Sequence, residues 1–312
     1  MSEKVLISGV ELILMEPANV DMEWVGNQEL INELKAAWMI VDEKNDLPLN
    51  PRILGKPGVG KTTLAYATGK FLNKPVYIFQ CTMDTRPDDL LINIIISSNN
   101  SIKYVASSLV SAVIKGGVCL LDEGNRMSEK SWASLAPLMD KRRYIDSLIA
   151  GIRIYAHPEF RLCVTMNSDS STYEVPEYIL SRMIKIQIDF PNRADELKIL
   201  KYNLPFSSED ILNYCVDFLQ NAHENDEAYT VRDGINIVRY YLKSRAFNNK
   251  DKDILDINEF KKAMLFVVDE SAIRYCSDEF KNDLEQKDKE SFDEESFDDE
   301  MFDDESDDDT VF

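Results

Sequence analysis

A glycine-rich run that ends in lysine and threonine has the clearest chemistry in this chain. The run consists of Gly55, Lys56, Pro57, Gly58, Val59, Gly60, Lys61, Thr62 and Thr63. It fits the P-loop pattern, in which glycines let successive backbone N–H groups turn toward a phosphate. Lys61 is expected to reach the β- and γ-phosphates of a nucleotide, and the Thr62 hydroxyl is expected to help hold Mg²⁺. The run therefore predicts a site for ATP and Mg²⁺.

Two consecutive carboxylates, Asp122 and Glu123, follow the apolar residues 118–121. A buried parallel strand ends in this way at the ligand edge of an α/β sheet. Asp122 can order the Mg²⁺ shell, and Glu123 can polarise the attacking water. An apolar run followed by two acids is common and is often only structural. Its position about sixty residues after the P-loop favours the catalytic interpretation.

Two other places have competing explanations. Asn167 ends a predicted buried strand that begins at Phe160; it could position a water near the γ-phosphate, or simply end a strand in a turn. Val25 and Gly26 precede a helical segment about thirty residues before the P-loop, where they could contact the nucleobase. A helix N-cap at Asn27 explains the same residues equally well.

The alternation of strand and helix patterns through residues 50–190 predicts how these side chains are positioned. It indicates a parallel sheet with helices on both faces, the α/β arrangement of P-loop NTPases. Residues 92–104 read as a β insertion, followed by a helix over 105–115, and residues 142–156 read as a β-hairpin. Beyond 194 only helices are predicted, at 194–200, 208–221, 230–245 and 257–275.

These changes of pattern divide the chain into four parts. Residues 1–19 form a β-rich extension, expected as a hairpin beside the main domain, and 20–192 form the α/β domain. Residues 193–276 form a smaller all-α domain, and 277–312 an acidic tail. The tail holds too little apolar surface to offset the entropy of ordering, so we expect it to be disordered.

Charge and cysteine usage limit the possible partners and compartment. The net charge of the 312 residues is −21, but residues 278–312 hold 18 Asp or Glu and 3 Lys and so carry −15 of it. No basic stripe in the sequence argues for direct nucleic-acid contact. Five widely spaced cysteines form no metal-type pair, and no signal peptide or membrane-length apolar run is present. These features favour buried thiols in the cytoplasm.

With these motifs in place, the chain resembles the AAA+ ATPases over about residues 20–276, and within them the MoxR-like group with a helix-2 insertion. Residues 55–62 resemble the Walker A motif, and 120–123 resemble Walker B. Residues 124–126 are similar to the Ile-Asn-Arg that often follows Walker B, with Gly124 a departure. Asn167 stands at the position of sensor 1. The segments 92–104 and 142–156 match the helix-2 and pre-sensor-1 insertions of this group.

The resemblance also implies roles for arginines. Arg182 occupies the position of the arginine finger that acts on a neighbouring subunit, although Met183 stands where Phe is usual. Arg232 resembles sensor 2, on a helical lid that closes over its own subunit's nucleotide. The alternatives are a surface arginine at a helix end for Arg182 and a salt bridge within the lid for Arg232. Whether Arg126 or Arg182 is the main arginine acting across the interface stays open.

The resemblance implies a ring, commonly a hexamer, with ATP bound between subunits. It also implies remodelling of a protein client, often one with a von Willebrand A domain. One alternative is an NTPase motor of a nucleic-acid system of restriction or defence type. The other is a nucleotide-gated binding scaffold.

The acidic tail contains a five-residue repeat with one phenylalanine per unit, at Phe292, Phe297 and Phe302. It could serve only to keep the protein in solution. Alternatively, it could be a multivalent ligand whose phenylalanines dock on a basic, apolar groove of a partner.

Overall fold

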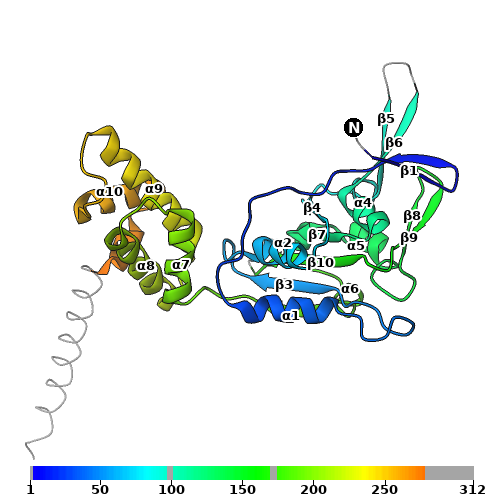
Figure 1. Cartoon of the computed structure of the whole chain (residues 1–312), viewed down its shortest axis with the longest axis horizontal. Helices are drawn as coiled ribbons and strands as arrows, with labels where there is room; N and C mark the ends of the chain where they lie inside the picture. Colours follow the sequence, from blue (N-terminus) through cyan, green and yellow to red (C-terminus); the bar gives the residue numbers. More distant parts are fainter. Residues whose placement is uncertain (1–2, 97–100, 169–173, 278–312) are drawn as a thin grey trace, which may run out of the picture. The chain divides into compact units, whose positions relative to one another are not determined.

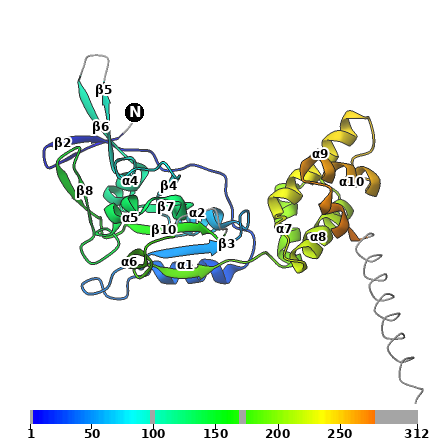
Figure 2. The same ribbon diagram turned by 180° about the vertical axis from the view of Figure 1, so that it is seen from behind.

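The computed structural model describes residues 3–96, 101–168 and 174–277. The chain forms two compact units, Met1–Pro191 and Asn192–Phe312 (Figures 1 and 2). The sequence pattern placed the boundary between the two units one residue later, after residue 192. The segment 278–312, with the phenylalanine repeats and nearly all of the predicted tail, lies outside the described residues.

A five-stranded parallel sheet forms the centre of the first unit. Its strands, in the order β11-β3-β10-β7-β4, are joined by parallel ladders throughout. Their bounds are Pro51–Gly55 for β3, Val76–Gln80 for β4, Val118–Asp122 for β7, Arg161–Asn167 for β10 and Ile184–Gln187 for β11. The predicted parallel sheet of a P-loop NTPase is confirmed.

Helices cover both faces of this sheet (Figure 1). One face packs against α1 (Gln28–Trp38) and α2 (Lys61–Phe71), where Leu120 shares a buried cluster with residues of both helices. The opposite face packs against α4 (Ser108–Lys115) and α5 (Glu129–Leu135), where Leu121 is buried. Successive side chains of a strand point to opposite faces, so a strand covered on both faces reads as a continuous apolar run.

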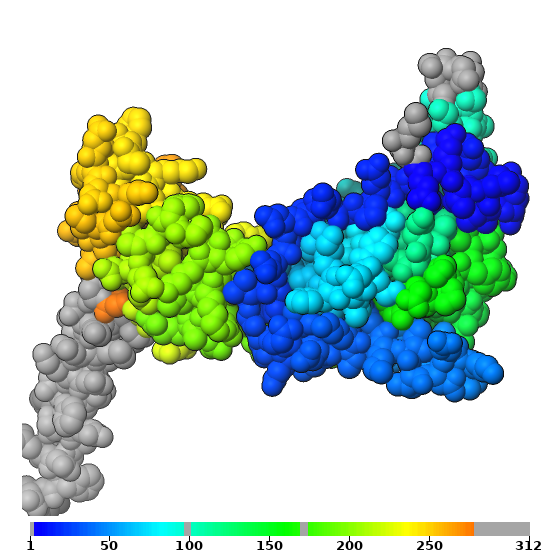
Figure 3. Space-filling view, in the orientation of Figure 1, coloured from blue at the N-terminus to red at the C-terminus, as the bar shows by residue number. Residues whose placement is uncertain are grey.

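The N-terminal extension is built into a second sheet of the first unit. Strands β1 (Lys4–Ile7) and β2 (Val10–Ile13) form the predicted hairpin, and β5 (Ile92–Ile96) and β6 (Ile102–Ala106) form the predicted insertion. β2 pairs with β6 through Leu12–Tyr104 and Ile13–Val105, giving the order β1-β2-β6-β5. The N-terminal strands therefore lie against the base of the insertion (Figure 3), rather than simply beside the domain.

The helix predicted over 105–115 starts later than expected. Val105 pairs with Asn93 as well as Ile13, so β6 continues to Ala106. The Ser107 hydroxyl then accepts a hydrogen bond from Val110 N at 3.1 Å and caps α4. Elsewhere in the unit are the short helices α3 (Pro87–Leu90) and α6 (Glu177–Leu180). The predicted hairpin at 142–156 is present as β8 (Tyr144–Ser147) and β9 (Ile152–Tyr155).

The second unit is helical, as expected. It contains α7 (Arg193–Asn203), α8 (Glu209–Glu224), α9 (Val231–Phe247), α10 (Ile257–Val267) and the 3₁₀ helix η2 (Ser271–Tyr275). The prediction of a single helix over 257–275 is wrong. The backbone leaves the helix at Val268, and the Asp269 carboxylate accepts from Ala272 N at 3.0 Å, which starts η2.

A buried acid stands in the core of the helical unit. Glu196 has no solvent exposure, and one of its carboxylate oxygens accepts a 2.7 Å hydrogen bond from Gln220 Nε2. The other oxygen has no hydrogen-bond partner. Burial disfavours the charged form and raises the pKa of Glu196 to about 7, against the action of the Gln220 hydrogen bond.

All five cysteines are buried and free, as the sequence predicted. Burial raises the pKa of the Cys119 thiol well above its ordinary value, so this side chain behaves as a small apolar group. Within residues 3–277, no described helix has both the length and the apolar character needed to cross a bilayer.

Candidate active site

The loop between β3 and α2 has the backbone geometry of a phosphate cradle. Gly58 and Gly60 have φ values of 80° and 94°, a region that residues with a Cβ rarely adopt. A Cβ on Gly55 would lie 2.4 Å from the carbonyl oxygen of Ile188, so the end of β3 also needs glycine. The loop leads directly into the first turn of α2, whose free N–H groups favour an anion.

Lys61, the first residue of α2, is buried and folds back onto this loop. Its Nζ donates to the carbonyl oxygens of Gly55 at 2.9 Å and Lys56 at 2.8 Å. The ammonium group is thus held beside the loop that the sequence assigned to the phosphates.

Asp122, at the end of β7, joins the P-loop helix to two strands. Its Oδ1 accepts hydrogen bonds from Thr62 Oγ1 at 2.7 Å and from Thr165 Oγ1 at 2.5 Å. Pairing of Asp122 with Gln80 and of Asn167 with Gly55 places the ends of four strands at one edge of the sheet. The arrangement expected from the separate motifs is therefore assembled.

The Thr62 and Asp122 oxygens fit Mg²⁺, which prefers hard oxygen ligands. The part of the chain that the structure describes has no group of three His, Cys, Asp or Glu side chains that could hold a metal. In Mg²⁺ sites that also hold a nucleotide, the protein commonly supplies one or two ligands, and water and substrate phosphates supply the others.

Glu123 is held from several sides. Its Oε1 accepts from Asn167 Nδ2 at 3.2 Å, and its Oε2 accepts from Gln80 Nε2 at 3.1 Å. Arg126 Nε lies 2.8 Å from Oε2 as an ion pair, without the alignment of a hydrogen bond. The backbone at Glu123 is left-handed (φ 57°, ψ 43°), and its N–H donates to Thr165 Oγ1 at 2.9 Å. A strained residue persists only where its surroundings determine its conformation, and here they do.

The 3₁₀ turn η1 (Gly124–Arg126) explains the departure from Ile at Gly124. A Cβ at this position would lie 2.4 Å from Val164 Cγ1 and 3.3 Å from the Trp132 ring, so the turn packs against β10 only with glycine. The next residue, Asn125, donates to the Asn167 carbonyl at 2.8 Å and accepts from Asn167 N at 3.3 Å. This reciprocal pair fixes the end of β10.

Three residues of this site were missed by the sequence reasoning: Gln80, Thr165 and Asn125. Gln80 is the polar end of an apolar strand, the same signal that identified Asp122 and Asn167. Thr165 is two residues before Asn167 and gave no separate signal. Its contacts with Asp122 and Glu123 depend on the pairing of β10 with β7.

Arg182 lies away from its own chain's P-loop. It comes just before β11, whose first residue, Ile184, pairs with Pro51 at the start of β3, whereas the P-loop follows the end of β3. Its guanidinium lies 3.5 Å from Asp140 and donates to the Tyr178 carbonyl. The structure thus places Arg182 at the opposite edge of the sheet from the P-loop.

Val25 and Gly26 follow Trp24, whose ring lies against the P-loop glycine Gly60. The Trp24 ring is the nearest side chain to both Gly26 and Gly60, 3.5 Å and 3.2 Å from a Cβ built at each. Asn27 caps α1, because its side chain accepts from Glu29 N at 2.9 Å. The capping explanation is therefore confirmed, and the nucleobase contact stays a prediction.

Arg232 is the second residue of α9 in the helical unit. A capping box between Thr230 and Asp233 fixes the start of this helix. The Arg232 side chain is exposed. Its role as sensor 2 stays a prediction.

Comparison with known proteins agrees with this geometry. Residues 52–183 match the family described as AAA domain (dynein-related subfamily). The chain is 24% identical over 184 residues to an uncharacterized protein of Staphylococcus saprophyticus, a match that covers 57% of this chain and 70% of that protein. It is also 28% identical over 178 residues to the denitrification regulatory protein NirQ of Stutzerimonas stutzeri. This match covers 56% of this chain and 61% of NirQ.

Among solved structures, the fold is similar to that of Thermotoga maritima RuvB, described as a Holliday junction branch migration motor. The TM-score is 0.54 at 15% identity, over 80% of this chain and 72% of the other. This likeness concerns the fold alone. The chain thus has the α/β fold of AAA+ P-loop proteins, and its residues 52–183 are similar to AAA domains of the dynein-related subfamily.

Proposed function

We propose that this protein hydrolyses ATP at sites shared by neighbouring copies in a ring and uses the cycle to remodel a protein client. The observation that carries the hydrolytic part is the pair of carboxylates at the edge of the sheet. Asp122 is bonded to the P-loop threonine, and Glu123 is held one residue further on by Asn167 and Gln80.

The residues of this edge have separate tasks in the proposal. The P-loop N–H groups and Lys61 bind and orient the phosphates, and Thr62 and Asp122 would hold Mg²⁺, which neutralises phosphate charge when bound. Glu123 accepts a hydrogen bond from the attacking water and draws off its proton as the bond to phosphorus forms. Asn167 and Gln80 keep the Glu123 carboxylate oriented, each through a hydrogen bond to one of its two oxygens.

The shared site is supported by where the two arginines lie. Arg126 is engaged with Glu123 of its own chain. Arg182 stands at the far edge of the sheet, where it cannot serve its own P-loop but can face the nucleotide of a neighbour. We therefore propose Arg182 as the main arginine acting across the interface, with Arg232 closing the lid within its own copy.

A protein client is supported by an exposed apolar hairpin. Ile94, Ile95, Ile96 and Ile102 on β5 and β6 are all exposed, Ile96 to 71%. Clustered exposed apolar residues mark surfaces that bind other proteins. The matched NirQ proteins are named regulatory proteins, a role that suits an ATPase acting on another protein. A client with a von Willebrand A domain belongs to the same proposal.

The test compares the full chain with a Glu123→Gln variant. We expect the variant to bind a fluorescent ATP analogue as tightly as the wild type and to lose hydrolysis by at least about 10²-fold, since general-base assistance contributes 10²–10⁴. For the wild type, hydrolysis per chain should rise with protein concentration as sedimentation shows assembly. Undiminished hydrolysis by Glu123→Gln, or full activity in a species that sediments as a monomer, would overturn the proposal.

A further inference from the structure

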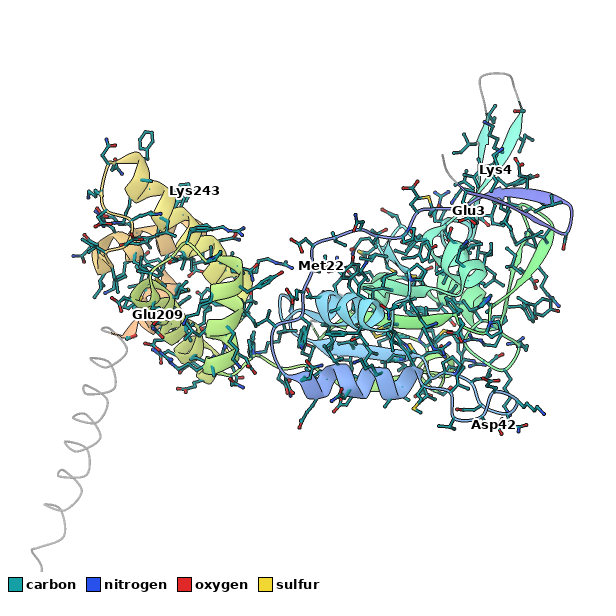
Figure 4. The ribbon with its side chains drawn as sticks, in the orientation of Figure 1. Glu3, Lys4, Met22, Asp42, Glu209 and Lys243 are labelled. Carbon is teal, nitrogen blue, oxygen red and sulfur yellow. The ribbon has the colours of Figure 1, made fainter. Side chains whose placement is uncertain are left out.

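The helix α9 carries an exposed row of positive charge. Arg232, Arg239 and Lys243 are all exposed, with Asn236 between the first two. Their spacing of four, three and four residues places them on one face of the helix. Lys243 is labelled in Figure 4. We call these four residues the basic stripe.

The cations of the stripe have no acidic partner among the described residues. Other cations of the same unit do: Arg245, also on α9, is buried and lies 2.6 Å from Glu259, and Arg193 lies 2.8 Å from Asp217. The stripe is thus a concentration of unneutralised positive charge on an acidic protein.

Exposed aromatic rings lie at the end of the stripe and beside it. Phe247, four residues after Lys243 at the end of α9, is 87% exposed. Phe266 on α10 is 71% exposed and stacks on Tyr240 of α9, with 4.3 Å between the ring centroids. A cationic row with apolar rings beside it suits a ligand that combines carboxylates with phenylalanines.

The chain contains a segment of that chemistry. Residues 278–312 carry a charge of −15 and five phenylalanines, and they follow directly on the helical unit that bears the stripe. Fully extended, 35 residues span up to about 115–126 Å, at 3.3–3.6 Å per residue. The 17 residues of α9 extend over about 25 Å. The segment is therefore long enough to reach every part of the stripe.

We propose that residues 278–312 dock on the basic stripe of the same chain. The carboxylates pair with Arg232, Arg239 and Lys243, and phenylalanines of the repeat pack against Phe247 and Phe266. Each exposed ion pair is weak, but the covalent connection supplies an effective concentration of about 1 mM. A docked tail would also cover Arg232, which connects it to the ATPase cycle; this consequence alone rests on the proposed function.

The test uses the full chain without nucleotide, so its outcome is independent of hydrolysis. Chymotrypsin cleavage at Phe292, Phe297 and Phe302 is followed by intact mass spectrometry at low ionic strength. The test variant is Arg239→Glu/Lys243→Glu. The matched control is Lys44→Glu/Lys252→Glu, which changes the charge equally at exposed cations away from α9 and α10.

We expect the tail of the stripe variant to be cut roughly three to ten times faster than that of the wild type and of the control, because proteolysis tracks the undocked population. The difference should vanish at about 0.5 M NaCl, where exposed charges are screened. Circular dichroism melting should match for all three proteins. Equal cleavage rates would overturn the proposal. Protection that grows with protein concentration would overturn docking within one chain and indicate a neighbouring copy.

Discussion

A subunit-mixing experiment gives the sharpest test of the shared site. The first and last residues of β3, Pro51 and Gly55, are about 13 Å apart at 3.3 Å per residue. Arg182 lies beyond the first of these ends and Lys61 beyond the second. The two side chains therefore cannot meet on one phosphate within a chain. A working site needs Lys61 from one copy and Arg182 from the next.

This separation sets the size of the expected effect. Lys61→Ala and Arg182→Ala should each be nearly inactive alone, the latter by about 10³–10⁵ if it acts as an arginine finger. In an equimolar mixture, about one quarter of interfaces combine an intact Lys61 with an intact Arg182, whatever the number of copies in a closed ring. The mixture should therefore recover about one quarter of wild-type hydrolysis.

Phosphate release is measured at fixed total protein after the variants have exchanged subunits in the presence of ATP. The control mixture combines Lys61→Ala with Glu123→Gln. Both residues belong to the same side of an interface, so no intact site can form and no activity should return. Full activity of Arg182→Ala alone, or no recovery in mixed assemblies verified by mass spectrometry, would refute the reasoning.

Three further predictions follow from individual contacts. Gln80→Ala removes a hydrogen bond that orients Glu123, and should lower kcat by several-fold in steady-state assays while leaving nucleotide affinity unchanged. Gly124→Ala forces a Cβ against Val164 and should lower the free energy of unfolding by about 1–3 kcal/mol in urea titrations, with partial rescue by Val164→Ala. The pKa of Glu196 rises from 4.5 to about 7 on folding, so the folded unit binds more protons between these values and its stability falls as pH rises through them. In the wild type, the free energy of unfolding should fall by about 3 kcal/mol between pH 4.5 and 8, and Glu196→Gln should abolish this fall. The measurement is the pH dependence of the free energy of unfolding, and an unchanged profile in the variant would contradict the prediction.

Local sequence was enough to predict the parts of the site that depend on one segment. The P-loop is a single turn whose glycines and lysine are adjacent in the chain, so its pattern is complete in the sequence. Asp122 and Glu123 were found because a strand buried on both faces is apolar until its end, where polar side chains meet the ligand. The same physics predicted the parallel sheet and the all-helical second unit.

What only the tertiary structure decided is which segments meet. Thr165 and Gln80 became part of the site because β10 and β4 flank β7, a register that no single segment encodes. The N-terminal hairpin forms one sheet with the insertion because β2 pairs with β6, which lies far along the chain. Arg182 was separated from its own P-loop because parallel strands place their two ends at opposite edges of the sheet. Pairing between distant strands depends on the whole sheet, and for that reason the sequence supplied the chemical groups while the fold chose their neighbours.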